Sequence, residues 1–450
     1  AAVAPLVGLR VPELRRRLYP NGQDSERDRV MLNRHVDLDR AQKLRELKLA
    51  WLAQNDAYRR VYPNGEVLAH VLGFTDVDDR GQEGIELVHD EKLKGVEGAR
   101  RVRRDARGQV IESPDVLRPA REGAQVKLSI DARVQHLAFR ALRQAVGEYK
   151  AQGGGIVVID VASGELLALA NFPSYDPNQR DRLNPAQMRN RVVTDIFEPG
   201  STLKPFTAAL ALELGKVTPA TVVNTAPGSL TVHGATIRDL HAYGALTVAE
   251  VIQKSSNVGS AKIALEHLDP SSMWHLYTGV GFGRAPKLGF PGEALGQVRP
   301  YKNWRPIEQA TMSYGHGIAL SLVQVARAYS IFARDGDLVP LTLVRRDESP
   351  EVQRVISPAT AKAVRAMLES VVSNKGTAPR AQISGYRAGG KTGTARKLEG
   401  GVYSTEKHIV SFVGFAPISA PRLIVAVMID DPHGRELTGG RVAAPVFSQV

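Results

Sequence analysis

The feature that most constrains the fold is the presence of strand-like segments at both ends of the chain beyond residue 150. Residues 155–160 and 165–170 are short apolar runs that flank the turn Ala162-Ser163-Gly164, a pattern typical of a β-hairpin. Three further strand-like runs follow near the C-terminus, at 390–398, 408–417 and 422–430. Helical patterns fill the interval, at 202–214, 248–255, 320–333 and 358–372. This order predicts an α+β fold in which one antiparallel sheet supports a cluster of helices.

Residues 1–150 have a different character. Residues 1 to about 120 are rich in Arg, Asp and Glu, and they contain a long helical pattern at 37–58, where Leu44, Leu47 and Trp51 recur at helical spacing. A chain of 450 residues with 43% hydrophobic content is too long for one ordinary core. We therefore expect two domains, an accessory domain with its linker at 1–150 and a larger domain at 151–450.

Composition and charge exclude several classes of function. The chain has no cysteine, which removes thiolate nucleophiles, disulfides and cysteine-ligated metals. Its formal net charge of +12 raises the possibility of a polyanionic partner. The arginine clusters at 15–17 and 100–104 are nevertheless followed closely by acidic residues, and no aromatic-interleaved basic stripe accompanies them. These clusters indicate solvated charged surfaces, and we expect no nucleic acid partner.

The start of the chain and its apolar runs bear on membrane association. The sequence begins at Ala1 without methionine, and runs such as 423–429 are far shorter than the roughly 20 residues that a membrane helix needs. We therefore expect a soluble segment, with any membrane anchor upstream of it.

A serine and a lysine stand three residues apart at Ser201 and Lys204, after a Pro-Gly break and before the apolar run 206–214. Residues i and i+3 share a helix face, so the amine can reach the hydroxyl and accept its proton, while the free N–H groups of the helix start face developing negative charge. The same spacing recurs at Ser404 and Lys407, in a predicted polar connector with no apolar helix after it. The pair alone is therefore weak evidence for a catalytic site, because a helix cap or a solvated loop explains the same spacing equally well.

Two other motifs accompany the first pair. Ser255-Ser256-Asn257 ends the helical pattern at 248–255, a position that often reflects only a helix terminus. Lys391-Thr392-Gly393-Thr394 opens a strand, where alternation puts Lys391 and Gly393 on one face and the two threonines on the other. The missing side chain at Gly393 lets a ligand backbone approach the strand edge.

In this order, the three motifs resemble the signature of penicillin-binding proteins and class A β-lactamases, with Ser256 where that signature has Asp. Further stretches resemble the class B penicillin-binding proteins, and the septal division type (penicillin-binding protein 3) more closely than the elongation type. These stretches are residues 73–79, 84–87, 188–191, 289–293 and 414–417. The resemblance covers roughly residues 60–450.

The resemblance implies a penicillin-binding/serine β-lactamase-like transpeptidase domain at 151–450 on an elongated, non-catalytic pedestal at 1–150. It implies a serine-type D-Ala-D-Ala transpeptidase that cross-links peptidoglycan stem peptides during septal wall synthesis and is inhibited by β-lactams. It also implies a single-pass anchor at the periplasmic face of the bacterial inner membrane, and division-complex membrane proteins as partners of the N-terminal domain. No metal or organic cofactor is expected.

Carried over residue by residue, the resemblance implies a role for each motif position. Ser201 would be the nucleophile, Lys204 its general base, Ser255 and Asn257 would assist proton transfer and substrate binding, and Lys391 would supply positive charge. Thr392, Gly393 and Thr394 would bind the substrate, the threonines through its terminal carboxylate, and the backbone N–H groups of Ser201 and Thr394 would form the oxyanion hole. Tyr403 would line the acceptor cleft. Because Lys204 can act as a base only when neutral, the proposal requires burial and a nearby Lys391.

The sequence leaves other functions open. A D-alanyl-D-alanine carboxypeptidase shares these motifs and uses water as the acceptor, and a non-enzymatic division scaffold or β-lactam sensor belongs to another class. A class A β-lactamase is disfavoured, because no Glu-x-x-Leu-Asn segment lies between Asn257 and Lys391. Two positions depart from the family: His316 stands where relatives commonly have Tyr, and Glu436-Leu437 stands where they often have an aromatic pair. We do not expect a catalytic role for His316, since the Ser/Lys pair supplies a base.

Overall fold

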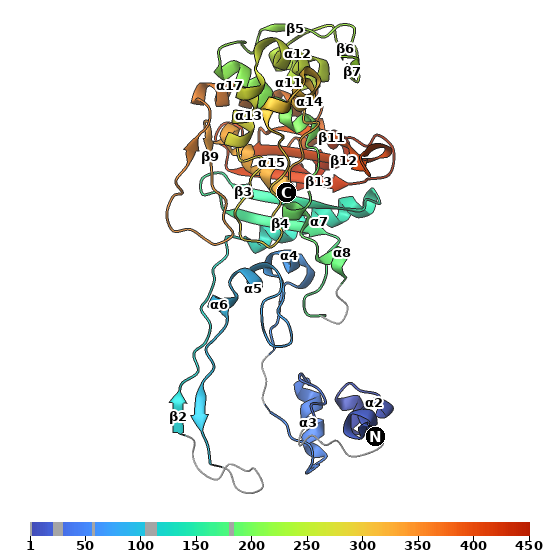
Figure 1. Ribbon diagram of the computed structural model, residues 1–450, viewed down its shortest axis with the longest axis vertical. Coiled ribbons are helices and arrows are strands. Elements are labelled where there is room, and N and C mark those ends of the chain that lie inside the picture. The colour runs from blue at the N-terminus through green and yellow to red at the C-terminus, as the bar shows by residue number, and fades with distance from the viewer. Residues whose placement is uncertain (1, 21–29, 56–58, 104–114, 180–183) are drawn as a thin grey trace. The chain divides into compact units, whose positions relative to one another are not determined.

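Strands from the two ends of the larger part of the chain form one antiparallel sheet, in the order β11-β12-β13-β3-β4 (Figure 1). The strands are β3 (Gly153–Asp160), β4 (Leu166–Phe172), β11 (Gly389–Glu399), β12 (Val402–Ala416) and β13 (Leu423–Asp430). β13 pairs with β3 in the interior of the sheet, so segments far apart in the sequence become neighbours. The predicted α+β fold with one antiparallel sheet is confirmed.

The structure is a computed structural model that describes residues 2–20, 30–55, 59–103, 115–179 and 184–450. It divides into two compact units, Ala1–Pro63 and Asn64–Val450. The boundary predicted between residues 150 and 151 stays a prediction.

The Ala1–Pro63 unit is a small helical module with its own core. Its helices are α1 (Val3–Leu6), α2 (Val11–Leu18) and α3 (Leu38–Glu46). The helix expected at 37–58 was wrong in length, because α3 ends at Glu46 and Lys48 has a φ of 46°. Leu47 and Trp51, which suggested a longer helix, are 38% and 55% exposed, so no apolar stripe is buried beyond α3. Residues 56–58 of that prediction lie outside the described residues.

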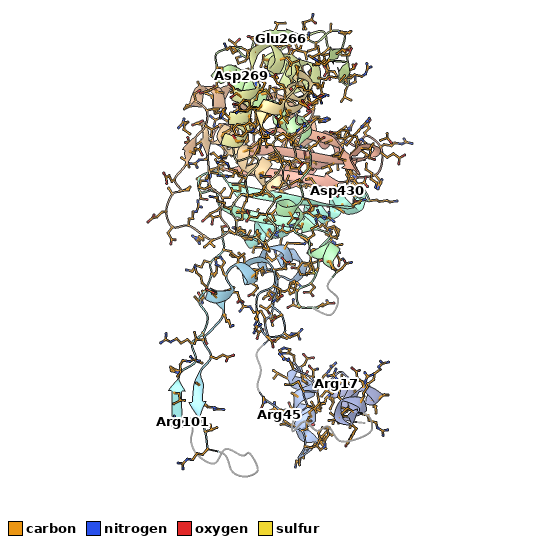
Figure 2. All side chains as sticks on the ribbon, viewed as in Figure 1. Arg17, Arg45, Arg101, Glu266, Asp269 and Asp430 are labelled. Atoms are coloured by element: carbon orange, nitrogen blue, oxygen red, sulfur yellow. The ribbon has the colours of Figure 1, made fainter. Side chains whose placement is uncertain are left out.

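Helices cover both faces of the five-stranded sheet. Gly154 and Gly155 on β3 point to opposite faces, and a Cβ at Gly154 would lie 3.0 Å from Leu142 on α7 (Ala132–Glu148). A Cβ at Gly155 would instead lie 2.6 Å from Val192 on α9 (Arg191–Thr194). α18 (Gly439–Gln449) packs beside α7, and α15 (Leu322–Ala328) packs beside α9. Side chains fill the space between these layers (Figure 2).

The predicted helical cluster surrounds one central helix, α10 (Lys204–Glu213), which follows the 3-10 turn η4 (Gly200–Leu203). Every residue from Lys204 to Ala211 is buried, as expected of a helix that is apolar on all sides. α10 contacts its neighbours α11 (Val248–Lys254), α12 (Asn257–His267), α13 (Pro270–Gly279) and α17 (Pro358–Val372). The first turn of α10 is thereby fixed from several sides.

The larger unit contains further short elements. They are η2 (Gly65–Val67), α4 (Ala69–Leu72), α5 (Gly84–Val88), α6 (Asp90–Leu93), β1 (Ala99–Arg101), β2 (Asp115–Arg118), α8 (Pro185–Met188), β5 (Val222–Asn224), β6 (Ser229–Val232), β7 (Ala235–Arg238), β8 (Ala245–Thr247), η5 (Tyr301–Asn303), α14 (Pro306–Met312), α16 (Ser330–Ala333), β9 (Asp337–Leu338), β10 (Gln353–Arg354) and η6 (Pro379–Ala381). No helix in the described parts of the chain is long and apolar enough to cross a membrane.

The hairpin β11–β12 extends beyond the rest of the sheet. β12 pairs with β13 only from Ile409 to Ala416, whereas its pairing with β11 continues to Val402. Ser404 and Lys407 therefore lie in a strand, and the predicted polar connector at these residues was wrong. The connection is only the turn Gly400-Gly401, whose residues both have positive φ. We call the residues beyond the β13 pairing, 396–408, the overhang.

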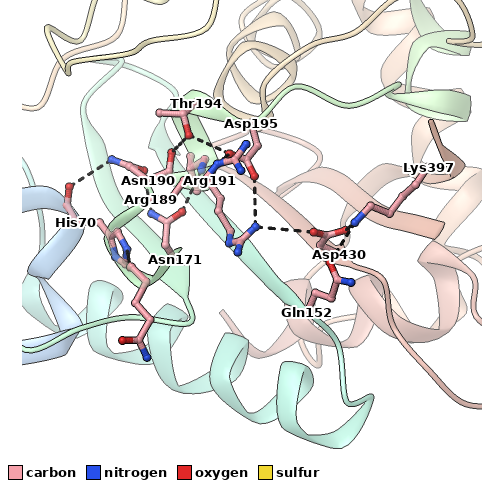
Figure 3. Close-up of polar contacts among 12 residues, drawn as sticks. His70, Gln152, Asn171, Arg189, Asn190, Arg191, Thr194, Asp195, Lys397 and Asp430 are labelled. Carbon is pink, nitrogen blue, oxygen red and sulfur yellow. Dashed lines mark hydrogen bonds and ion pairs between the residues drawn. The ribbon is translucent and has the colours of Figure 1, made fainter. Parts of the chain in front are cut away.

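A polar network anchors the segment that leads to Ser201 (Figure 3). Arg191 forms ion pairs with Asp195, at 3.4 Å, and with Asp430 at the end of β13, at 3.8 Å. Lys397 on β11 also pairs with Asp430, at 2.7 Å. The Asn190 side chain, next to Arg191 in the chain, donates to the backbone oxygen of His70 on α4. The approach to η4 is thus tied to the sheet and to α4.

The core around α10 yields a stability prediction. Phe206 is fully buried against Phe282, Tyr329 and Phe332, with ring centroids 4.9–5.6 Å away. Phe206→Ala should lower the free energy of unfolding by about 3–5 kcal/mol, because it removes buried apolar area and leaves a cavity. Denaturant unfolding measures this change. Leu240→Ala, at an 89% exposed position, should change it by less than about 0.5 kcal/mol, and equal losses would contradict this account of the core.

Candidate active site

Ser201 lies in η4, directly before the buried helix α10. The preceding Gly200 has a φ of 55°, and its N–H donates to the Gly315 carbonyl at 3.2 Å. A Cβ at Gly315 would lie only 2.1 Å from the Gly200 oxygen, so the two backbones touch. The close contact holds the Ser201 turn against the loop at 313–317.

Lys204 places its amine among four oxygen atoms. Its Nζ lies 2.5 Å from Ser201 Oγ, 2.7 Å from Asn257 Oδ1, 3.0 Å from the Ser255 carbonyl oxygen and 3.3 Å from Ser255 Oγ. A neutral amine has two N–H donors and one lone pair. The donors match the Ser255 carbonyl and Asn257 Oδ1, which leaves the lone pair for the Ser201 hydroxyl to donate to. This is the hydrogen-bond pattern of a base ready to accept the Ser201 proton.

The electrostatic surroundings favour the neutral form of Lys204. Burial, and secondly the positive charge of Lys391, lower the pKa of Lys204 well below its ordinary value, while Asp239 opposes the shift. Burial also lowers the pKa of Lys391 to about 7. Both side chains are completely buried. The requirement that the two amines lie close together is met through Ser255, whose hydroxyl is 2.9 Å from Lys391 Nζ and 3.3 Å from Lys204 Nζ.

Ser255 and Asn257 reach the site because the chain turns sharply between α11 and α12. Ser255 caps α11 in the left-handed conformation, with φ 61° and ψ 39°, which turns both its carbonyl and its hydroxyl towards the two lysines. Asn257 is the first residue of α12, and its Nδ2 donates to the Arg238 carbonyl at 3.0 Å. That bond orients the amide so that Oδ1 faces Lys204.

Asp239 holds this turn, and the sequence analysis missed it. Its carboxylate accepts bonds from Ser256 Oγ at 2.6 Å, Asn257 N at 2.5 Å and Val258 N at 3.0 Å. Ser256 Oγ in turn accepts a bond from the Gly259 N–H. A carboxylate at the start of α12 satisfies free N–H groups and suits the helix dipole. Asp239 lies on a loop 17 residues before Ser256 and outside the three motifs, and no periodic or motif signal in the sequence marks it.

Strand β11 forms the opposite wall, with the alternation that the sequence predicted. Lys391 faces Ser255, and a Cβ at Gly393 would lie 2.8 Å from the Pro199 oxygen, so both face the Ser201 turn. The Thr392 hydroxyl lies 3.4 Å from the Lys391 amine. Thr392 Oγ1 lies 3.2 Å from Thr377 Oγ1, and Thr394 Oγ1 accepts a bond from the Gly439 N–H at 3.2 Å. Thr394 is exposed, and its backbone packs against Gly200.

An aromatic and acidic group borders the Ser201 turn on the side of the overhang. Tyr403 donates to Glu198 Oε1 at 2.8 Å, and its ring stacks on His316 at a centroid distance of 6.2 Å. His316 also contacts Tyr314, whose ring centroid is 5.8 Å from Lys204 Nζ. Burial lowers the pKa of His316, although Glu198 acts in the opposite direction. Burial and Glu198 raise the pKa of Tyr403 to about 12, so its hydroxyl stays protonated.

The structure therefore brings five sequence-predicted residues into direct contact and places the others along the adjacent walls. The five are Ser201, Lys204, Ser255, Asn257 and Lys391. Two positions were noted as departures from the family. His316 stacks on Tyr403 next to the Ser201 turn, and Glu436 forms an ion pair with Arg441. Among the described residues, no three metal-ligating side chains gather in one place.

Comparisons with known proteins give a consistent result. Residues 154–450 match the Penicillin binding protein transpeptidase domain, and residues 11–128 match the Penicillin-binding Protein dimerisation domain. The chain is 41% identical to the probable peptidoglycan D,D-transpeptidase PenA of Neisseria gonorrhoeae, over all of this chain and 76% of that protein. It is 40% identical to the peptidoglycan D,D-transpeptidase FtsI of Escherichia coli, over 94% of this chain and 71% of that protein.

A solved structure agrees with these sequence relationships. The transpeptidase domain of penicillin-binding protein 3 from Burkholderia pseudomallei has a TM-score of 0.67 and 50% identity to this chain. The match covers 72% of this chain and 93% of that one.

The charge of Asp239 yields a pH prediction. A negative charge stabilises protonated Lys204 and so raises its pKa, which means that Asp239→Asn should lower that pKa. Lys204 would then be neutral at lower pH, and the acid limb of the rate of acylation of Ser201 by a penicillin should move to lower pH. Stopped-flow acylation across pH measures this shift.

Glu266→Gln is the matched control, because it removes an exposed carboxylate nine residues along α12 from Asn257. Its pH profile should equal that of the unmodified protein. A shift of the Asp239→Asn limb to higher pH would contradict the electrostatic assignment.

Proposed function

Because the chain belongs to the family of penicillin-binding protein transpeptidases, we propose that its five contacting residues carry out the acyl transfer of a peptidoglycan D,D-transpeptidase. The chain is an enzyme of this type, related to the class B, division-associated members. The observation that carries the assignment of roles is the 2.5 Å contact between Ser201 Oγ and a buried Lys204 amine whose pKa is strongly lowered.

In the acylation half-reaction, Ser201 transfers its proton to neutral Lys204 as Oγ attacks the carbonyl carbon of the D-Ala-D-Ala amide. The C–N bond of the tetrahedral intermediate then breaks, and the departing D-Ala amine receives a proton from Lys204, relayed by the Ser255 hydroxyl between the two lysines. The backbone N–H groups of Ser201 and Thr394 stabilise the oxyanion, each contributing roughly 3 kcal/mol. The close packing of Gly200 against Thr394 supports this pairing.

Substrate binding is assigned to the β11 wall. The donor peptide lies along the free edge of the strand, and the hydroxyls of Thr392 and Thr394 hold its terminal carboxylate. The missing side chain at Gly393 lets the strand pack against the Ser201 turn instead of leaving space for a ligand, because a Cβ there would lie 2.8 Å from the Pro199 oxygen. Lys391, whose pKa of about 7 allows partial charge at neutral pH, adds electrostatic attraction. The second half-reaction is attack of an acceptor amine on the acyl-enzyme, which forms the cross-link and frees Ser201.

The N-terminal part is assigned a supporting role. Residues 1–150 form a non-catalytic pedestal with its linker and residues 151–450 form the transpeptidase domain, a division supported by the matched ranges 11–128 and 154–450. The enzyme acts at the periplasmic face of the inner membrane at the septum, and its N-terminal domain binds membrane proteins of the division complex. The relationship to FtsI supports this placement.

Intact-protein mass after addition of a penicillin tests the assignment of Ser201. The unmodified protein should gain one stable adduct. Ser201→Ala should gain none, because it lacks the Oγ atom that forms the ester with the penicillin. Ser404→Ala is the matched control, since it removes the hydroxyl of the second Ser-x-x-Lys pair, and it should form the adduct normally. An adduct on Ser201→Ala would refute the assignment.

A donor thioester, with and without a D-amino acid, then separates transfer from hydrolysis. The D,D-transpeptidase should form the aminolysis product in proportion to the acceptor. Turnover that ignores the acceptor would favour a D-alanyl-D-alanine carboxypeptidase, rapid release of penicilloate would indicate a β-lactamase, and absence of turnover after acylation would favour a scaffold or sensor.

A further inference from the structure

Glu198 is a half-buried acid near the nucleophile in the sequence, and the acylation chemistry described above assigns it no role. It lies three residues before Ser201, and its Oε1 accepts two bonds, from Tyr403 at 2.8 Å and from the Gly317 N–H at 2.7 Å. Its Oε2 is buried and, among the described residues, has no hydrogen-bond partner. A buried carboxylate oxygen without a donor is costly, so a donor from outside the protein is the natural partner to seek.

The surroundings define what such a donor must be. Glu198 is tied at once to the Ser201 turn, to the 313–317 loop and to the overhang, and the rings of Tyr403 and His316 stack next to it. Tyr314 continues the wall towards Lys204. Carboxylate and aromatic faces together suit a cation, through a charge-assisted hydrogen bond and cation–π attraction.

We propose that Glu198, with Tyr403 and His316, forms the subsite that binds the ammonium group of the acceptor strand before transfer. The inference rests on the proposed function, since an acceptor amine is needed only by a transpeptidase. It deepens that function, because it identifies the residue that favours an amine over water. Glu198 is the acceptor-binding residue, and Lys204 remains the base.

The step balances as follows. The acceptor arrives as R–NH₃⁺ beside Glu198 and loses one proton to solvent, and the amine nitrogen attacks the acyl carbon held by Ser201 Oγ. The new N–C bond forms, the second proton passes from nitrogen to neutral Lys204 and then to Oγ, and the C–Oγ bond breaks. The products are an amide cross-link, the free Ser201 hydroxyl and one proton in solution.

Because Glu198 Oε2 is buried, an acceptor amine can reach it only if part of the overhang moves. Tyr403, the hydrogen-bonded neighbour from that segment, is 42% exposed. Its strand has no partner on the β13 side before Ile409, so a displacement of the Tyr403 ring breaks no pairing with β13. Opening of the carboxylate is assigned to a movement of this side chain, which is bonded to Oε1 of the same carboxylate.

Glu198→Gln tests the subsite, because the amide keeps an oxygen for Tyr403 and Gly317 but removes the charge and replaces the other oxygen by an NH₂ donor. With a thioester donor and D-alanine as acceptor, the ratio of aminolysis to hydrolysis should fall about 10-fold or more, through a higher KM for D-alanine. The second-order rate of acylation by a penicillin should stay within about 2-fold. With D-lactate as acceptor, which has a hydroxyl in place of the ammonium, the variant should match the unmodified protein.

Two further variants make the outcome decisive. Glu406→Gln removes an exposed carboxylate from the same strand as Tyr403 and should leave the ratio unchanged. Glu198→Asp keeps the negative charge on a shorter side chain, so its ratio of aminolysis to hydrolysis with D-alanine should lie between those of the unmodified protein and Glu198→Gln. An unchanged ratio in Glu198→Gln, or equal losses of acylation and transfer, would overturn the subsite. If the unmodified protein transfers to no acceptor, the proposed function fails instead.

Discussion

The buried amine of Lys204 is the interaction on which the rest of the site depends. It contacts the nucleophile from its own helix turn and three oxygen atoms of the segment between α11 and α12, while the second lysine approaches the same Ser255 hydroxyl from β11. Only a neutral amine has a lone pair that can accept the proton of Ser201 while its two N–H groups donate to Ser255 and Asn257. Burial supplies that condition, and the neighbouring positive charge strengthens it.

The fold explains how a neutral lysine is held in place. α10 is enclosed by other helices, so Lys204 has no route to solvent along its own helix. β11 is an edge strand that presents Lys391 and the small Gly393 to the turn that carries Ser201. The edge position matters, because a strand paired on both sides would leave no backbone groups for a peptide substrate. The antiparallel sheet thus supplies both rigidity and a free edge.

Much of this could be predicted from the sequence. Strand-like runs at both ends of the larger domain predicted the sheet, because period-two alternation and turn residues are local signals, and the three motifs predicted the cluster of Ser201, Lys204, Ser255, Asn257 and Lys391. Asp239 and Glu198 were missed, since a carboxylate that caps the start of another helix or completes the wall of a site leaves no periodic pattern in the sequence. The helix at 37–58 was overestimated because spacing alone cannot show that Leu47 and Trp51 lack a surface to pack against. The part of the overhang that contains Ser404 and Lys407 was predicted as a polar connector because it carries few apolar residues.

Direct titration of Lys204 tests the central claim most closely. The ε-carbon signal of this residue can be followed across pH by NMR in lysine-labelled protein, with Lys204→Arg to assign it. Lys204 should titrate well below the 10.5 of an ordinary lysine. A midpoint near that ordinary value would mean that the amine is an ammonium at working pH, and the assignment of Lys204 as the base of acyl transfer would then be wrong.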